Sequence, residues 1–249
     1  MKSILLGLVL LLSSPAMAAT DASDDWHDLD TILNATLDID VTGHVTHVQL
    51  DDHHVTPALQ TLAEQNSHDW MFIPATLNGI PFAARTYARL QLQGKAEGDG
   101  QALHIRYLDH GPRVIKIAHP WFPLMMRFQQ HEAVVALTAV VQLDGTLADI
   151  HVIAARVTDG AEGKAFYKSC IRALKSSRMK PEMVDGYPVR TTVKLALAFS
   201  LDGFTDNLLQ KQNLLPASDA PKPASNDNEE LNTARMVVID SPLKFRGAP

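Results

Sequence analysis

Alternating hydrophobic and polar positions occur twice along the chain, and each time they predict the order strand, strand, helix, strand. In the first stretch, apolar residues alternate with acids over residues 37–41, and an apolar face resumes after a Thr-Gly turn. A period of two predicts half-buried strands. Apolar residues at helical spacing then follow Thr56 and Pro57, which suit the cap and the first position of a helix. A long alternating run over residues 84–93 completes this first unit.

The second stretch repeats this order from residue 133 onward. "AVVALTAVVQLDGTLADIHVIAA" predicts two strands around an Asp-Gly turn. The next segment predicts a helix opened by Asp159, with Glu162 three residues later in the arrangement of a capping box. Cys170 lies on the apolar face of this helix, which predicts a buried, inert thiol. An alternating run over residues 189–199 predicts the last strand.

A proline-glycine-proline motif ends each predicted helix. "WMFIPATLNGIPF" begins at Trp70, and "RMKPEMVDGYPV" repeats its spacing. The prolines stop the helix and hold the chain extended, while the glycine allows the turn before the returning strand. We expect the two aromatic residues to bury against the sheet, so the motif is interpreted as structural. Its residues are Trp70, Phe72, Pro74, Gly79 and Pro81 in the first unit, and Pro181, Gly186 and Pro188 in the second.

Two segments lie outside the repeated pattern. Residues 95–118 predict a connecting hairpin, which either extends the first sheet or joins the two units. Residues 206–249 are rich in Pro, Ser, Asn and acids, and we expect most of this tail to be disordered. An apolar run at residues 235–240 predicts one strand in the tail, which pairs either with its own domain or with another copy.

The N-terminus has the pattern of a secretory signal peptide. Lys2 precedes an apolar run over residues 4–12, and Ala-Met-Ala follows. The run is shorter than the ~20 apolar residues of a membrane span. We therefore expect residues 1–18 to be a signal peptide cleaved between Ala18 and Ala19, and the protein to be exported to the periplasm. The single cysteine cannot form an internal disulfide there, so core packing must hold the fold.

Composition excludes some classes of function. The 249 residues are 46% hydrophobic and carry a formal net charge of -6, which argues against a mostly disordered chain and against nucleic-acid binding. No motif pairs a nucleophile with a base, and "HEAVV" lacks the second histidine of a zinc protease. We expect neither an enzyme nor a cofactor.

A histidine-rich segment provides the alternative hypothesis. His44 and His47 are an odd number of residues apart on a predicted strand and therefore point to opposite faces. The adjacent loop could hold zinc or copper through imidazole and carboxylate groups, although its spacing matches no known ligand set. The simpler interpretation is a solvated turn whose acids precede a helix N-terminus. The loop residues are Asp51, Asp52, His53 and His54.

Residues 120–199 resemble the C-terminal domain of the TonB energy-transducer family. "HPWFP", the strand pair, the helix and the Pro-x4-Gly-x-Pro motif occur in that domain's order, with Ser177 and Met179 where the family prefers Trp and Phe. Residues 33–93 resemble a more divergent copy, whose "WMFIPA" is nearer to the family's W-x-F-x-P-A pattern. The resemblance implies an α+β fold of two tandem units, residues 24–94 and 119–205. Each unit is then a three-stranded antiparallel sheet with a helix packed on one face.

The family's domain pairs its sheet edge with a short strand of an outer-membrane receptor. An unpaired edge offers N–H and C=O groups to such a strand. The resemblance therefore implies a non-catalytic periplasmic module that binds envelope protein segments, with a link to TonB-dependent transport. Self-association through the same edges is a further expectation. This chain departs from the family in its cleavable N-terminus and in lacking the Pro-rich spacer, so we expect a stand-alone binding protein. The side chains expected to select a partner are Arg190, Thr192 and Lys194 in the second unit and Arg85, Tyr87 and Arg89 in the first.

Overall fold

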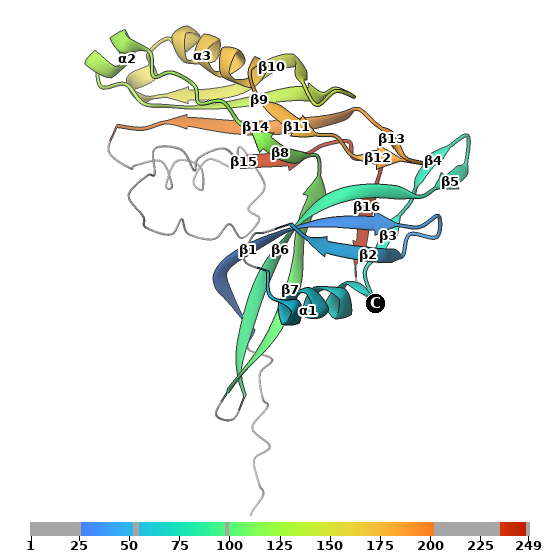
Figure 1. The fold of residues 1–249 in the computed structure, drawn as a ribbon. Helices are drawn as coiled ribbons and strands as arrows, with labels where there is room; N and C mark the ends of the chain where they lie inside the picture. The colour runs from blue at the N-terminus through green and yellow to red at the C-terminus, as the bar shows by residue number, and fades with distance from the viewer. Residues whose placement is uncertain (1–25, 52–54, 98–99, 202–234, 248–249) are drawn as a thin grey trace, which may run out of the picture.

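The computed structural model describes residues 26–51, 55–97, 100–201 and 235–247 (Figure 1). The predicted signal peptide with Ala18 and Ala19, the residues Asp52–His54 and most of the predicted disordered tail lie outside these ranges. Within the described ranges, no helix is long and apolar enough to cross a membrane.

The first sheet is built around a long central strand pair, β1 and β6. β1 pairs antiparallel with β2 on one side and with β6 on the other, and β6 also pairs with β7. Every second residue of β1 from Leu33 to Ile39 is buried, so the alternation in the sequence corresponds to the core face. Helix α1 follows the cap provided by Thr56, whose hydroxyl accepts from the Leu59 amide. The elements are β1 (His27–Ile39), β2 (Val45–Leu50), α1 (Pro57–Ser67), β3 (Met71–Ile73), β4 (Ala75–Leu77), β5 (Ile80–Phe82), β6 (Ala84–Glu97) and β7 (Gly100–Gly111).

The second sheet has the strand order β10-β9-β14-β15, with all neighbours antiparallel. Helix α3 packs on it through Phe166, Cys170 and Leu174, all fully buried. Figure 1 shows α2 and α3 on the side of this sheet that points away from the first sheet. The elements are β8 (Arg113–Lys116), α2 (Leu124–Phe128), β9 (Ala133–Val141), β10 (Leu147–Val157), a 3-10 turn (Thr158–Gly160), α3 (Lys164–Lys175), β11 (Arg178–Lys180), β12 (Met183–Val184), β13 (Tyr187–Pro188) and β14 (Thr191–Phe199).

The predicted capping box of the second helix is wrong. Helix α3 begins at Lys164, and its N-cap residue Gly163 has no side chain to accept from the first turn. Asp159 instead belongs to the 3-10 turn and has a φ of 57°, whereas an N-cap residue takes extended backbone angles. Glu162 forms an ion pair with Lys164 at the helix start.

The two proline-glycine-proline motifs form the same local structure. In each, a two-residue turn with positive φ joins two short strands: Asn78-Gly79 between β4 and β5, and Asp185-Gly186 between β12 and β13. Positive φ at both central residues is the requirement of a type I′ hairpin turn, which explains the Asn-Gly and Asp-Gly pairs. Trp70 and Phe72, which precede the first hairpin, are buried in the first core.

Several strands cross between the two parts of the molecule. β7 extends the first sheet, whereas β8, which follows it directly, pairs with β11 of the second part. The β12–β13 hairpin pairs with β6 through Met183 and Val184. The segment over residues 95–118 therefore both extends the first sheet and connects the two parts.

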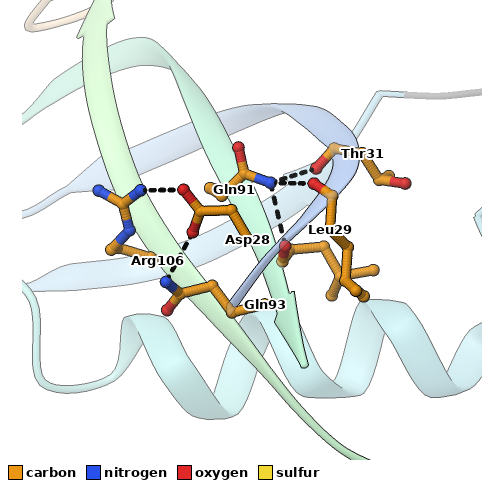
Figure 2. A network of polar contacts seen from close by, with 7 residues as sticks. Asp28, Leu29, Thr31, Gln91, Gln93 and Arg106 are labelled. Carbon is orange, nitrogen blue, oxygen red and sulfur yellow. Dashed lines mark hydrogen bonds and ion pairs between the residues drawn. The ribbon is translucent and has the colours of Figure 1, made fainter. Parts of the chain in front are cut away.

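A polar network stabilises the irregular start of β1 (Figure 2). The β1–β6 register shifts between Asp28 and Ile32, which leaves backbone carbonyls out of the ladder. The buried Gln91 amide donates to the carbonyls of Leu29, Thr31 and Leu92, so a polar side chain inside the strand is satisfied. Asp28 accepts from Gln93 Nε2 at 2.7 Å and from Arg106 Nη2 at 2.9 Å.

Residues 235–247, here called the C-terminal strap, are ordered and join the two parts. β15 (Arg235–Val238) pairs with β14 of the second sheet, and β16 (Lys244–Gly247) pairs with β3 of the first part. Figure 1 shows the strap running from the second sheet to the first. The strand predicted within residues 235–240 is β15, whereas residues 244–247, which belonged to the part of the tail expected to be disordered, form β16 by pairing with a strand far away in the sequence.

Candidate functional site

The edge of β14 is the place where a partner strand was expected, and the strap occupies it. Four residue pairs join the two strands, from Val193 opposite Val238 to Ala196 opposite Arg235. The pairing continues past β15, since the Ile239 amide donates to the Thr192 carbonyl at 2.9 Å. The tail strand thus pairs in cis, with its own domain.

Asp240, just after β15, binds the strap to the start of β14. Its carboxylate accepts from the Thr192 amide through Oδ1 and from the Thr192 hydroxyl through Oδ2, the latter at 2.7 Å. Hydrogen bonds to an ionised acceptor are stronger than neutral ones. Thr192, predicted to select a partner, is therefore engaged by the strap.

The other two residues predicted to select a partner, Arg190 just before β14 and Lys194 within it, have different surroundings. The Arg190 guanidinium is exposed and donates from Nε to Gln142 Oε1 at 2.9 Å. Lys194 is half-buried and lies opposite Thr138 on β9 and opposite Val237 on the strap. The structure therefore places Arg190 just before the edge strand and Lys194 directly beside the strap in the same sheet.

Glu182 connects three segments of the chain. It is fully buried, and its carboxylate accepts from Thr86 of β6 at 2.6 Å, Thr191 of β14 at 3.1 Å and Ser241 of the strap at 2.9 Å. A buried carboxylate is tolerated only when such donors replace its hydration. The site therefore joins both sheets and the strap in one polar network.

The strap ends in an aromatic cluster of the first part. Phe245 stacks on Tyr107 with ring centroids 3.9 Å apart, and Leu243 is buried beside them. His110 Nδ1 contacts the Tyr107 hydroxyl, and its Nε2 lies 3.2 Å from the Leu243 carbonyl oxygen. Burial lowers the pKa of His110 and raises the pKa of the Tyr107 phenol. His110 Nε2 thus contacts the strap in a desolvated environment, while Nδ1 contacts Tyr107 of the first part.

The three site residues predicted on the first sheet do not lie on a free edge. β6 pairs with β1 on one side and with β12 and β7 on the other, so the prediction of an open third strand is wrong there. Arg85 forms a bidentate ion pair with Asp38 across 2.6 and 2.8 Å. Arg89 is held by Asp109, with Nε 2.9 Å from Oδ1.

Tyr87 lies at a cavity of about 450 Å³ between β6, β7 and β8. The side chain is 5% exposed, and its hydroxyl has no hydrogen-bond partner among the described residues. Arg113 and Lys180 stand over the ring at 5.4 and 5.1 Å from its centroid. The strap contributes Met236 to the cavity wall, so this space also depends on the strap.

The alternative metal site receives no support from the part of the chain that the structure describes. Asp51 is bound by Arg113, with Nη1 2.5 Å from Oδ2, and the same oxygen accepts from the Thr36 hydroxyl at 2.9 Å. No group of three His, Cys, Asp or Glu side chains in the described ranges could hold a metal ion. Burial raises the pKa of the Cys170 thiol to about 12, so a thiolate ligand or nucleophile is disfavoured at neutral pH.

The sequence contained one signal for the Glu182 network that periodicity does not capture. Glu182 follows Pro181 in the repeated motif, where the first unit has Ala75. Both positions are buried, so an acid in this place requires partners. The partners themselves come from residues as distant as Thr86 and Ser241, which no local pattern could identify.

Comparison with known proteins identifies a family for the second sheet and its helices. No curated protein matches the chain significantly. Residues 118–201 match the family described as Gram-negative bacterial TonB protein C-terminal. The matched segment contains α2, β9, β10, α3 and β14, the sheet and helices described above. Residues 118–201 therefore form a TonB C-terminal-like domain.

Proposed function

We propose that this protein is a non-catalytic binding module of the cell envelope, which binds a segment of an envelope protein by strand addition at β14. The observation that carries the proposal is the strap itself, a short antiparallel strand bound along this edge. Backbone groups supply the affinity in such pairing, and side chains that alternate along the edge supply selectivity.

A partner strand can replace the strap at the edge of β14. It pairs with Val193–Ala196, whereas β14 extends over Thr191–Phe199. No described strand pairs with Leu197–Phe199 on this side, so an incoming strand can begin there and then replace β15. A partner that pairs with the whole of β14 makes more backbone hydrogen bonds than the strap does.

The other outer strand of the second sheet is a poorer template. β10 carries two register shifts in its pairing with β9, between Ala148 and His151 and between Val152 and Ala154. Bulges of this kind disturb the row of free N–H and C=O groups and discourage pairing with another chain. This favours β14 over β10 as the binding edge.

The TonB C-terminal-like domain supports a proposal for location and partner. We place the protein in the periplasm after cleavage of residues 1–18, and we propose an outer-membrane receptor as the partner, with a link to TonB-dependent transport. A second copy of this chain is the alternative partner, since the same edge can accept another strap.

We further propose that the first unit, predicted over residues 24–94, is a divergent second copy of the same unit. In both units a turn glycine packs against the strand after the helix. The Phe72 amide donates to the Gly43 carbonyl at 2.8 Å, and the Met179 amide donates to the Gly145 carbonyl at 2.9 Å. The bridges His44–Met71 and Thr146–Arg178 occupy equivalent positions beside these contacts.

A reversible disulfide between β14 and the strap tests whether a partner strand replaces the strap. Thr192 lies opposite Ile239, so cysteines at both positions, T192C and I239C, suit a disulfide across the two strands. The two cysteines are introduced into a C170A background. The oxidised form, with the disulfide, and the reduced form, without it, are each used to capture proteins from solubilised envelope. We expect an outer-membrane protein to bind only the reduced form, with C170A alone binding in both conditions. Equal recovery by the oxidised form would contradict binding at β14.

A further inference from the structure

A cluster of large apolar side chains projects from the second part of the molecule. Trp121, Leu124, Met125 and Phe128, here called the apolar cap, are 84%, 65%, 64% and 74% exposed. Surface helices normally turn polar residues outward, and an exposed apolar cluster marks an interaction site. The apolar cap is therefore interpreted as a surface that another molecule covers.

The apolar cap is held in a fixed orientation. On the inner side of the same segment, Phe122 packs edge-to-face on Phe166 with centroids 5.7 Å apart, and Met126 also contacts the second core. The Ser169 hydroxyl of α3 donates to the Trp121 carbonyl. Because Phe122 and Met126 fill the inward positions, the remaining apolar side chains must face outward.

A cationic stripe lies beside the apolar cap. Residues 162–181 contain six cations and one acid, Glu162, which forms an ion pair with Lys164, although the chain as a whole has a net charge of -6. Four of these cations recur at helical spacing on the exposed side of α3: Lys164, Lys168, Arg172 and Lys175. Arg127 adds a cation within the apolar cap itself. The local charge therefore opposes the overall charge of the protein.

We propose that the apolar cap and the cationic stripe dock this protein on an anionic lipid bilayer. Trp and Phe are suited to the headgroup region, Leu and Met reach the acyl boundary, and Lys and Arg attract anionic headgroups. Figure 1 places α2 at an outer extremity of the molecule, where a projecting tip fits a planar surface better than a protein groove. This inference is independent of the strand exchange proposed for β14.

Docking in this orientation leaves the binding edge accessible. The helices α2 and α3 cover the side of the second sheet that points away from the first sheet, whereas the strap runs from β14 toward the first sheet (Figure 1). The bilayer would therefore contact the helical side while β14 and the strap remain free for a protein partner.

Vesicle binding of the full chain, in the form recovered from cells, tests the proposal. The vesicles contain phosphatidylcholine alone or with about 30% phosphatidylglycerol. We expect at least about tenfold stronger co-sedimentation with the anionic vesicles, and its loss at about 1 M salt, where screening is nearly complete. Brominated lipid should quench the emission of Trp121, and a W121F variant should lose this quenching.

Matched variants separate the apolar and the charged contributions. L124S/F128S should weaken binding to the anionic vesicles about tenfold or more, and K168E/R172E should remove the preference for anionic lipid. The control is L77S/I80S on the β4–β5 hairpin, since Leu77 and Ile80 are 65% and 60% exposed and lie elsewhere. Equal binding to neutral vesicles, unchanged binding of L124S/F128S, or self-association through the apolar cap without vesicle binding would overturn the proposal.

Discussion

The Thr192 hydroxyl donates to the Asp240 carboxylate at 2.7 Å, although 48 residues separate the two in the chain. The same carboxylate also accepts from the Thr192 amide, at the point where the strap leaves β14. A side chain of the strap thus completes the hydrogen bonding of an edge that would otherwise be open to a partner strand. Access to β14 depends on how readily this end of the strap opens.

Replacing Asp240 with alanine should loosen the strap without unfolding the protein. In the antiparallel register the amides of Thr192 and Lys194 point toward the strap. We expect both amides to exchange hydrogen about fivefold faster in D240A, which corresponds to about 1 kcal/mol of local opening. Hydrogen exchange measured by NMR provides the test, with E97A at the end of β6 as the control. Unchanged exchange at Thr192 would show that Asp240 does not hold the edge.

Removing the Glu182 carboxylate should destabilise the whole protein. E182A leaves the buried hydroxyls of Thr86 and Thr191 and the half-buried hydroxyl of Ser241 without their acceptor. We expect a loss of about 2–4 kcal/mol in the free energy of unfolding, and about 1–2 kcal/mol for E182Q, which keeps one acceptor oxygen. Urea unfolding measures both. The exposed Glu162 supplies the control E162A, which should change stability by less than about 0.5 kcal/mol. Equal effects of E182A and E162A would refute the role of the network.

The turn glycines of the two units should respond alike to substitution. A Cβ at Gly43 would lie 1.9 Å from the Phe72 carbonyl oxygen, and a Cβ at Gly145 would lie 2.1 Å from the Met179 carbonyl oxygen. Since backbone atoms cannot move aside cheaply, we expect G43A and G145A each to cost about 2–3 kcal/mol in thermal or urea unfolding. G160A is the control, because Gly160 also has positive φ but has no neighbour within 4 Å of an added Cβ. If one of the two turns tolerates alanine, the proposed equivalence of the units fails.

His110 should make stability depend on pH in mildly acidic solution. Burial holds the pKa of the folded imidazole below its ordinary value near 6.5, so the unfolded chain binds the proton more readily. Its contribution is complete above about pH 6.5 and is lost as the pH falls toward the folded pKa, by at most about 1.4 kcal/mol per pH unit.

The measurement compares urea unfolding of the wild-type protein and H110Q from neutral to mildly acidic pH. We expect the difference in the free energy of unfolding between the two proteins to shrink as the pH is lowered. H68Q is the control for replacing a histidine with glutamine, because the His68 side chain is largely exposed. A constant difference between wild type and H110Q would exclude His110 as the titrating group.

The sequence by itself determined the long strands, the two main helices and the turns between them. Thr56 and Pro57 predicted the start of α1, and the alternation over residues 189–199 predicted β14, which extends over Thr191–Phe199, and its buried face. Gly79 and Gly186 predicted the two turns, and the structure shows that each turn joins a pair of short strands. These features depend on contacts within a few residues, where periodicity, capping and positive φ act directly.

Only the tertiary structure decided which edges are open and which charges are buried. The pattern of β6 reveals its buried face but not the strand beside it, so Arg85 and Arg89 were expected on an edge that β12 and β7 in fact cover. The strap likewise covers β14, and Glu182 obtains its partners from three distant segments. The physical reason is that side-chain periodicity is local, whereas strand pairing and the satisfaction of a buried charge depend on residues far apart in the chain.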